Sequence, residues 1–443
     1  MKKYLTTNNI NGRFYFSSNL IEINNYDESF KQKIERILSL DIDDKNIILT
    51  DEEIKILSII YHEVTHFLDL TTTTWGIEYL SRKTNFLNKK DLQSLDVFKL
   101  NVAEIEMHDE LVELLEPSTD VKLLDCLFQH ALVYNENYGS LIMVVFSFNN
   151  QRLYTVPFSM LSLLEGSAYS REVLIKIQNI EKLPDEIERT ISLKILEGEC
   201  NEVLNNIKLS EYNLVLILTK RHFPDLSFKE LLTFVKVLIH FVLNLGGMNI
   251  SMISTFLKQT FIEKHIGYAI IKDMQRGMSR HIIVFKFILL MYEYLEHKSS
   301  DREELMKVLK KSPMKFIQNF IYFYRIPYKK LIDSRKKTSE FYILINLLKK
   351  QEQTFDMDIL FNSSILNKEM IEATPNTLVK ISNLKLLDIS LEDGTNITMP
   401  NRLDIDINEF FDKNQEKFLM IDNAFKETDM YKFHIHPLDV THV

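Results

Sequence analysis

Glycine and proline are scarce in this chain, and their scarcity limits the folds that it can adopt. The 443 residues include 10 glycines and 9 prolines, which disfavours β architectures built from many short strands and turns. From about residue 90 to residue 350 the apolar side chains recur mostly at helical spacing, as Leu305, Val308 and Leu309 do. The sequence therefore predicts a mainly α protein with a smaller β component, which is an α+β composition.

The β component is expected close to the two ends of the chain. Residues 13–16, 20–23 and 46–49 are short apolar or alternating runs of the kind that form strands. Residues 386–391 and 396–399 flank an Asp-Gly turn, and this arrangement is typical of a β-hairpin. We expect a small sheet at the N-terminus and a hairpin near the C-terminus.

A capping box predicts where a long helix begins. Thr50 is a suitable N-cap, and Glu53 stands three residues after it. The helix that follows carries two histidines four residues apart, His62 and His66, with Glu63 directly after the first of them. Side chains four residues apart lie on one face of a helix. Both imidazoles can therefore reach one metal ion, while Glu63 reaches a water bound to that ion.

This combination has a specific chemical use. Zinc bound in this way lowers the pKa of its water towards ~7 and polarises a carbonyl oxygen. The Glu63 carboxylate would accept the proton as the water attacks, which makes it the candidate general base. The alternative interpretation is a pair of histidines with a purely structural role.

The segment from Tyr61 to Leu68 resembles the active-site helix of the zincin metallopeptidases. The resemblance implies a zinc-dependent enzyme that hydrolyses a peptide bond with metal-activated water and with Glu63 as general base. It also implies a small sheet beside the helix, whose edge strand holds an extended substrate. Residues 46–49 would resemble that strand.

The third metal ligand distinguishes subgroups of zincins. Metzincins place Gly and His three and six residues after the second histidine, whereas this chain has Asp69 and Thr72 there. A glutamate from a later helix, as in gluzincins, fits better, and we favour Glu165. The small residues that follow, Gly166, Ser167 and Ala168, would let this second helix approach the first closely. The alternative is an ordinary helical glutamate beside a packing glycine.

Other residues compete for roles around the metal. Glu78 and Glu104 are the main rivals of Glu165 as third ligand, and Glu106 is a further one. Asp69 lies on the same helical face as His66 and could orient a ligand imidazole. The residues Tyr169 and Arg171 are candidate donors to an oxyanion formed during hydrolysis.

The composition indicates a soluble protein of a reducing compartment. The two cysteines, Cys126 and Cys200, cannot form a disulfide framework, and no secretory signal is visible in the first residues. The most apolar stretches, 231–245 and 282–295, each contain a lysine and are too short to cross a bilayer. The net charge of −9 argues against nucleic acid as a partner. We expect a cytoplasmic protein whose partner is a protein or peptide substrate.

We expect three consecutive regions along the chain. Residues 1–180 would form the zincin-like catalytic core, residues 181–350 a helical region, and residues 351–443 an acidic α+β region. Two other functions are compatible with the sequence. One is a helical interaction or scaffold protein with a structural or inactive motif, and the other is a zinc hydrolase that acts on a non-peptide bond.

Overall fold

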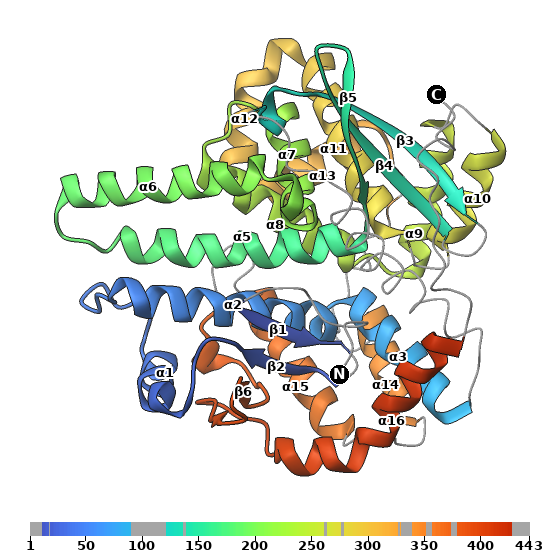
Figure 1. Ribbon diagram of the computed structural model, residues 1–443. Helices are drawn as coiled ribbons and strands as arrows, with labels where there is room; N and C mark the ends of the chain where they lie inside the picture. Colours follow the sequence, from blue (N-terminus) through green and yellow to red (C-terminus); the bar gives the residue numbers. More distant parts are fainter. Residues whose placement is uncertain are drawn as a thin grey trace. The chain divides into compact units, whose positions relative to one another are not determined.

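The computed structural model describes residues 11–16, 18–89, 121–135, 139–260, 264–275, 279–326, 328, 339–350, 357–373 and 379–427. These residues form a mainly α-helical protein with two small sheets, so the expected α+β composition is confirmed (Figure 1). The helices are α1 (Lys31–Ser39), α2 (Asp51–Thr72), α3 (Thr74–Lys89), α5 (Met160–Ile180), α6 (Glu186–Asn205), α7 (Ser210–His222), α8 (Phe228–Leu243), α9 (Gly247–Leu257), α10 (Lys264–Gln275), α11 (Arg280–His297), α12 (Arg302–Lys311), α13 (Pro313–Phe323), α14 (Glu340–Lys350), α15 (Met357–Ala373) and α16 (Ile407–Glu427). The strands are β1 (Gly12–Tyr15), β2 (Leu20–Ile23), β3 (Leu127–Asn135), β4 (Gly139–Phe148), β5 (Gln151–Phe158), β6 (Ile389–Leu391) and β7 (Asn396–Ile397).

The chain divides into two compact units, and each unit is assembled from separate segments. The first unit comprises Met1–Leu95, Ala168–Glu197 and Asp333–Thr428. The second unit comprises Asp96–Ser167, Gly198–Ile332 and Asp429–Val443.

This division differs from the three consecutive regions, 1–180, 181–350 and 351–443, that the sequence suggested. The reason is a long-range strand pairing: β6 lies parallel to β2 and brings the C-terminal hairpin into the sheet of the N-terminal segment. The hairpin of β6 and β7 itself forms as expected.

Among the described strands, the sheet of the first unit has the order β1-β2-β6-β7, so β1 stands at one end of this order. β1 and β2 are antiparallel, and Asn19 with a φ of 61° occupies the turn that joins them. The strand expected at residues 46–49 is absent, because turns use the backbone there. Asp44 Oδ1 accepts a hydrogen bond from the Asn46 amide, and the Ile47 amide donates to the Asp44 carbonyl.

Helix α2 begins at the predicted capping box. The Thr50 hydroxyl accepts a hydrogen bond from the Glu53 amide, and the Glu53 carboxylate accepts one from the Thr50 amide. These bonds satisfy backbone donors that a helix N-terminus otherwise leaves unpaired. From Ile56 to Thr72 every side chain of α2 is buried, so His62, Glu63 and His66 lie on a core helix.

The C-terminal end of α2 is fixed by threonines and one glycine. The hydroxyls of Thr71, Thr72 and Thr73 each donate to the carbonyl four residues earlier, which competes with continuation of the helix. A Cβ on Gly76 would lie 1.9 Å from the Leu70 carbonyl oxygen. Only glycine therefore permits the tight break at which α2 ends and α3 begins.

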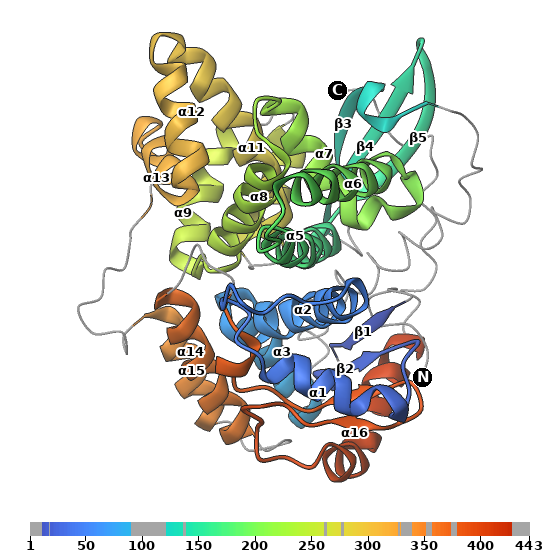
Figure 2. The ribbon, with the colours of Figure 1, turned by 90° about the vertical axis from the view of Figure 1, so that its left-hand side faces the viewer.

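Other helices of the first unit pack around α2. α15 and α3 both contact it, and α14 packs on α3 and α15. Figure 2 shows α14 and α15 side by side. Lys368 of α15 donates from its Nζ to the Thr72 carbonyl at 3.2 Å, so a cation interacts with the negative end of the α2 dipole.

The second unit combines the antiparallel sheet β3-β4-β5 with helices α7 to α13. Its core is rich in aromatic side chains, such as Phe285 against Phe158 and Phe320 against Phe287. In the part of the chain that the structure describes, no individual helix has the length and apolar character needed to cross a membrane. α8 and the segment Gly247–Thr260 satisfy that test jointly, but they are bent by 110°.

Candidate metal centre

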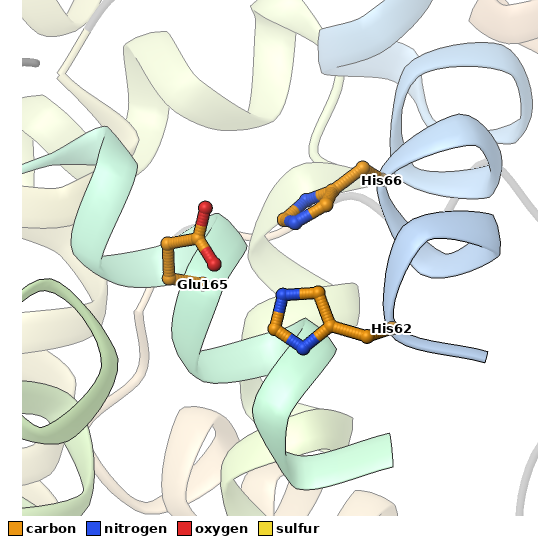
Figure 3. A group of neighbouring side chains, drawn as sticks. All are labelled: His62, His66 and Glu165. Carbon is orange, nitrogen blue, oxygen red and sulfur yellow. The ribbon is translucent and has the colours of Figure 1, made fainter. Parts of the chain in front are cut away.

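The side chains of His62, His66 and Glu165 converge (Figure 3). Each offers one ligand atom, and these atoms all lie within 4.8 Å of one another. All three side chains are buried, with 1%, 0% and 1% of their surface exposed. Two imidazole nitrogens and a carboxylate oxygen form a donor set typical of catalytic zinc. The residues present therefore fit a metal ion of this kind.

A single continuous helix carries Glu165 to this position. The division between the two units falls inside α5, after Ser167. Glu172, seven residues after Glu165 and already in the first unit, contacts His62. Residues seven apart lie on nearly the same face of a helix, about 10 Å apart along its axis. Glu165 and Glu172 therefore lie on nearly the same face of α5.

Glu172 is the hydrogen-bond partner of His62. Its Oε2 lies 3.1 Å from His62 Nδ1, and its Oε1 lies 2.8 Å from Lys176 Nζ. Burial would raise the pKa of Glu172, but the hydrogen bond with His62 and the charge of Lys176 outweigh burial and lower it to about 2. Glu172 is therefore a carboxylate and can only accept. His62 Nδ1 then carries the proton, so Nε2 is the ring nitrogen that could bind a metal.

Glu63, the candidate general base, lies against strand β1. It is fully buried, and a Cβ built on Gly12 would come within 2.7 Å of its Oε1. Gly12 therefore provides the space that the Glu63 carboxylate occupies. Sequence reasoning placed residues 46–49 beside the motif, whereas the strand in that position is β1.

Aromatic rings surround the second histidine. The ring centroid of His66 lies 6.1 Å from that of Phe14, stacked, and 6.1 Å from that of Phe16. The His62 and His66 rings are 5.1 Å apart at an interplanar angle of 71°. These apolar neighbours lower the local dielectric constant, which strengthens charge interactions at the site.

Gly166 makes room for a different helix from the one expected. A Cβ on Gly166 would lie 2.3 Å from Val215 Cγ1 on α7 and 3.9 Å from Ile239 Cδ1 on α8. Gly166 therefore permits close packing of α5 within the second unit. The prediction that this glycine makes room for α2 was wrong.

Of the alternative candidates for the third ligand, the structure describes Glu78 but not Glu104 or Glu106. Among the described residues, the group that could hold a metal consists of His62, His66 and Glu165, so Glu78 on α3 is not part of it. Glu104 and Glu106 lie outside the described residues.

The other expected site residues lie on the facing helices. Asp69 is buried and interacts electrostatically with Arg171. Burial lowers the pKa of Arg171, and the charge of Asp69 opposes this by raising it. Tyr169 is also buried and stands one turn after Glu165 on α5. The sequence suggested Asp69 as the residue that orients an imidazole, whereas in the structure Glu172 contacts the His62 imidazole. The available signal was the spacing of two helical turns between Glu165 and Glu172.

We compared the chain with family models, with curated proteins and with solved structures, and none of them matches it.

Proposed function

We propose that this protein is a zinc-dependent metallopeptidase with a zincin-like centre. The observation that carries the proposal is the buried convergence of His62, His66 and Glu165 with Glu63 adjacent in sequence to the first ligand. Three protein ligands leave a fourth zinc position for water or substrate, as in catalytic sites, whereas structural sites are closed by four.

The residues of the chain have distinct tasks in this proposal. His62, His66 and Glu165 would bind the metal. Glu172 would hold the His62 ring through its Nδ1. A zinc ion there would supply a water with a pKa near ~7 and polarise the scissile carbonyl. Glu63 would accept the proton of the attacking water and later deliver it to the leaving amine, in the manner of a general base and acid. Tyr169 and Arg171 are the candidate oxyanion donors.

The position of β1 favours a peptide over a non-peptide substrate. β1 is the outermost of the described strands on its side of the sheet, and its first residue, Gly12, lies against Glu63. An extended peptide can add to the edge of a sheet through main-chain hydrogen bonds. Such a peptide on β1 would run past the base and the metal ligands. We also propose a cytoplasmic location, because Cys126 and Cys200 are both buried thiols that form no disulfide.

Metal content and peptide cleavage test the proposal together. Purified protein should contain about one zinc per chain by mass spectrometry, and His66→Ala or Glu165→Ala should lose it. Glu63→Gln should keep the zinc but cleave a peptide library about 10²- to 10⁴-fold more slowly. Glu78→Gln is the matched control and should retain both properties. Wild-type protein that takes up no metal when zinc is supplied would favour the scaffold alternative.

A further inference from the structure

Lys176 extends the hydrogen-bonded chain that starts at His62. Glu172 uses one carboxylate oxygen for His62 Nδ1 and the other for Lys176 Nζ, at 3.1 and 2.8 Å. The exposed fraction of the side chains rises along this series, from 1% for His62 to 16% for Glu172 and 25% for Lys176. The three residues belong to the first unit.

We infer that Lys176 is a positioning residue of the metal centre, which holds Glu172 so that His62 keeps its proton on Nδ1 and offers Nε2 to the metal. This inference rests on the proposed function, because it takes His62 as a metal ligand. No group of Lys176 needs to touch the metal or the substrate. Its effect reaches the centre through Glu172 and then through the His62 ring.

The physical basis of this positioning is that each of the two carboxylate oxygens of Glu172 has a hydrogen-bond partner of its own. A glutamate held at one oxygen can still turn about its terminal torsion, which is broad and weakly restrained. Partners on both oxygens of Glu172 fix that torsion. Without Lys176 the carboxylate can turn away from the imidazole towards solvent. The His62 ring then populates the tautomer with the proton on Nε2, which cannot bind a metal through that nitrogen.

The zinc affinity should fall with the population of the competent tautomer. When a fraction of the protein is competent to bind, the apparent dissociation constant rises by the inverse of that fraction. If Lys176 acted only through its charge, its removal would strengthen zinc binding, because the lysine cation repels the doubly charged zinc ion. Solvent reaches Lys176 and screens this repulsion, so the positioning effect should dominate. The direction of the change separates the two roles.

The experiment measures zinc affinity of the full-length protein by competition with a chromophoric chelator. Lys176→Met should weaken zinc binding by about 3- to 10-fold, less than the 10- to 100-fold expected of Glu172→Gln. Lys176→Arg keeps a donor and should restore most of the affinity. Lys413→Met removes another i,i+4 ion pair, with Glu409 on α16, and should leave the affinity unchanged.

A second readout uses metal-free protein. Nitrogen-15 NMR of selectively labelled histidine, with the His62 signals assigned by a His62→Gln variant, reports which ring nitrogen carries the proton. The wild type should show the proton on Nδ1, and Lys176→Met should show a mixture of tautomers. Equal or tighter zinc binding by Lys176→Met, or an unchanged His62 tautomer, would overturn the inference. If the wild type bound no zinc, the proposed function would fail, and the tautomer measurement would still decide the role of Lys176.

Discussion

Gly12 and Glu63 are in such close contact that a single methyl group on the glycine would collide with the carboxylate. The Cβ of an alanine at position 12 would lie 2.7 Å from Glu63 Oε1 and 3.0 Å from Glu63 Cγ. Glu63 belongs to the buried helix α2 and Gly12 to strand β1. The strand therefore determines where the candidate base can stand, without contributing a reactive group.

Gly12→Ala should separate catalysis from metal binding. The added methyl displaces the Glu63 carboxylate but touches none of the proposed ligands, so the zinc content should stay near that of the wild type. Cleavage should fall by about 10²-fold, because small misplacements of a catalytic group are costly. Zinc analysis and peptide cleavage on one preparation make the comparison.

Gly198→Ala serves as the control for the previous variant. Gly198 lies within α6, and a Cβ there would meet no atom within 4 Å. Alanine is favoured over glycine in a helix by about 1 kcal/mol, so this variant should be slightly more stable and equally active. Loss of zinc from Gly12→Ala would show that β1 supports the ligands as well as the base.

Gly166→Ala should destabilise the second unit. The new Cβ would lie 2.3 Å from Val215 Cγ1, and the branched valine cannot turn aside freely. Overpacking of this kind costs about 1–3 kcal/mol in free energy of unfolding. Val215→Ala removes the opposing methyl groups, so the double variant should recover part of that loss. Urea unfolding of the two single variants and the double variant gives the coupling energy, and additive effects would contradict this account.

Zinc should stabilise the protein if the three buried ligands bind it. A ligand that binds only the folded state, at about 1,000 times its dissociation constant, adds about 4 kcal/mol. Differential scanning fluorimetry should show a higher unfolding temperature with zinc than after dialysis against a chelator. Glu165→Ala should lose most of this difference. An equal zinc-dependent shift in wild type and Glu165→Ala would indicate binding elsewhere.

Local features of the sequence predicted parts of the site well. The capping box of Thr50 and Glu53 depends on residues three apart, and the common face of His62 and His66 depends on residues four apart. Such spacings follow from helix geometry alone. The start of α2 and the shared face of the histidines could therefore be derived without tertiary information.

Features that depend on distant segments could not be derived in the same way. Glu172 and His62 are 110 residues apart, and the spacing of Glu172 from Glu165 points to their contact only once Glu165 is taken as a metal ligand. The pairing of β2 with β6 joins opposite ends of the chain, which no periodicity reveals. Residues 46–49 have strand-like composition, but the turns at Asp44 use their backbone groups. In the first two cases tertiary structure completes the local preference, whereas at residues 46–49 local turns override it.

Lys83 should make the stability of the first unit depend on pH. Burial lowers its pKa to about 7, and its Nζ donates to the Phe16 carbonyl at 3.0 Å. In the unfolded chain its pKa is the ordinary 10.5, so between pH 7 and 10.5 the unfolded state binds more protons. The free energy of unfolding should therefore rise with pH, by at most about 1.4 kcal/mol per pH unit.

The contribution of Lys83 is isolated by comparing variants rather than by the wild type alone. Lys83→Met keeps an apolar side chain of similar length and removes the titrating group, so urea unfolding between pH 7.5 and 9.5 should show a flatter pH dependence. Lys315→Met, at an exposed position on α13, should keep the wild-type slope. If Lys83→Met and the wild type gained equal stability over that range, Lys83 would have to be charged in the folded protein, with its charge balanced inside the first unit.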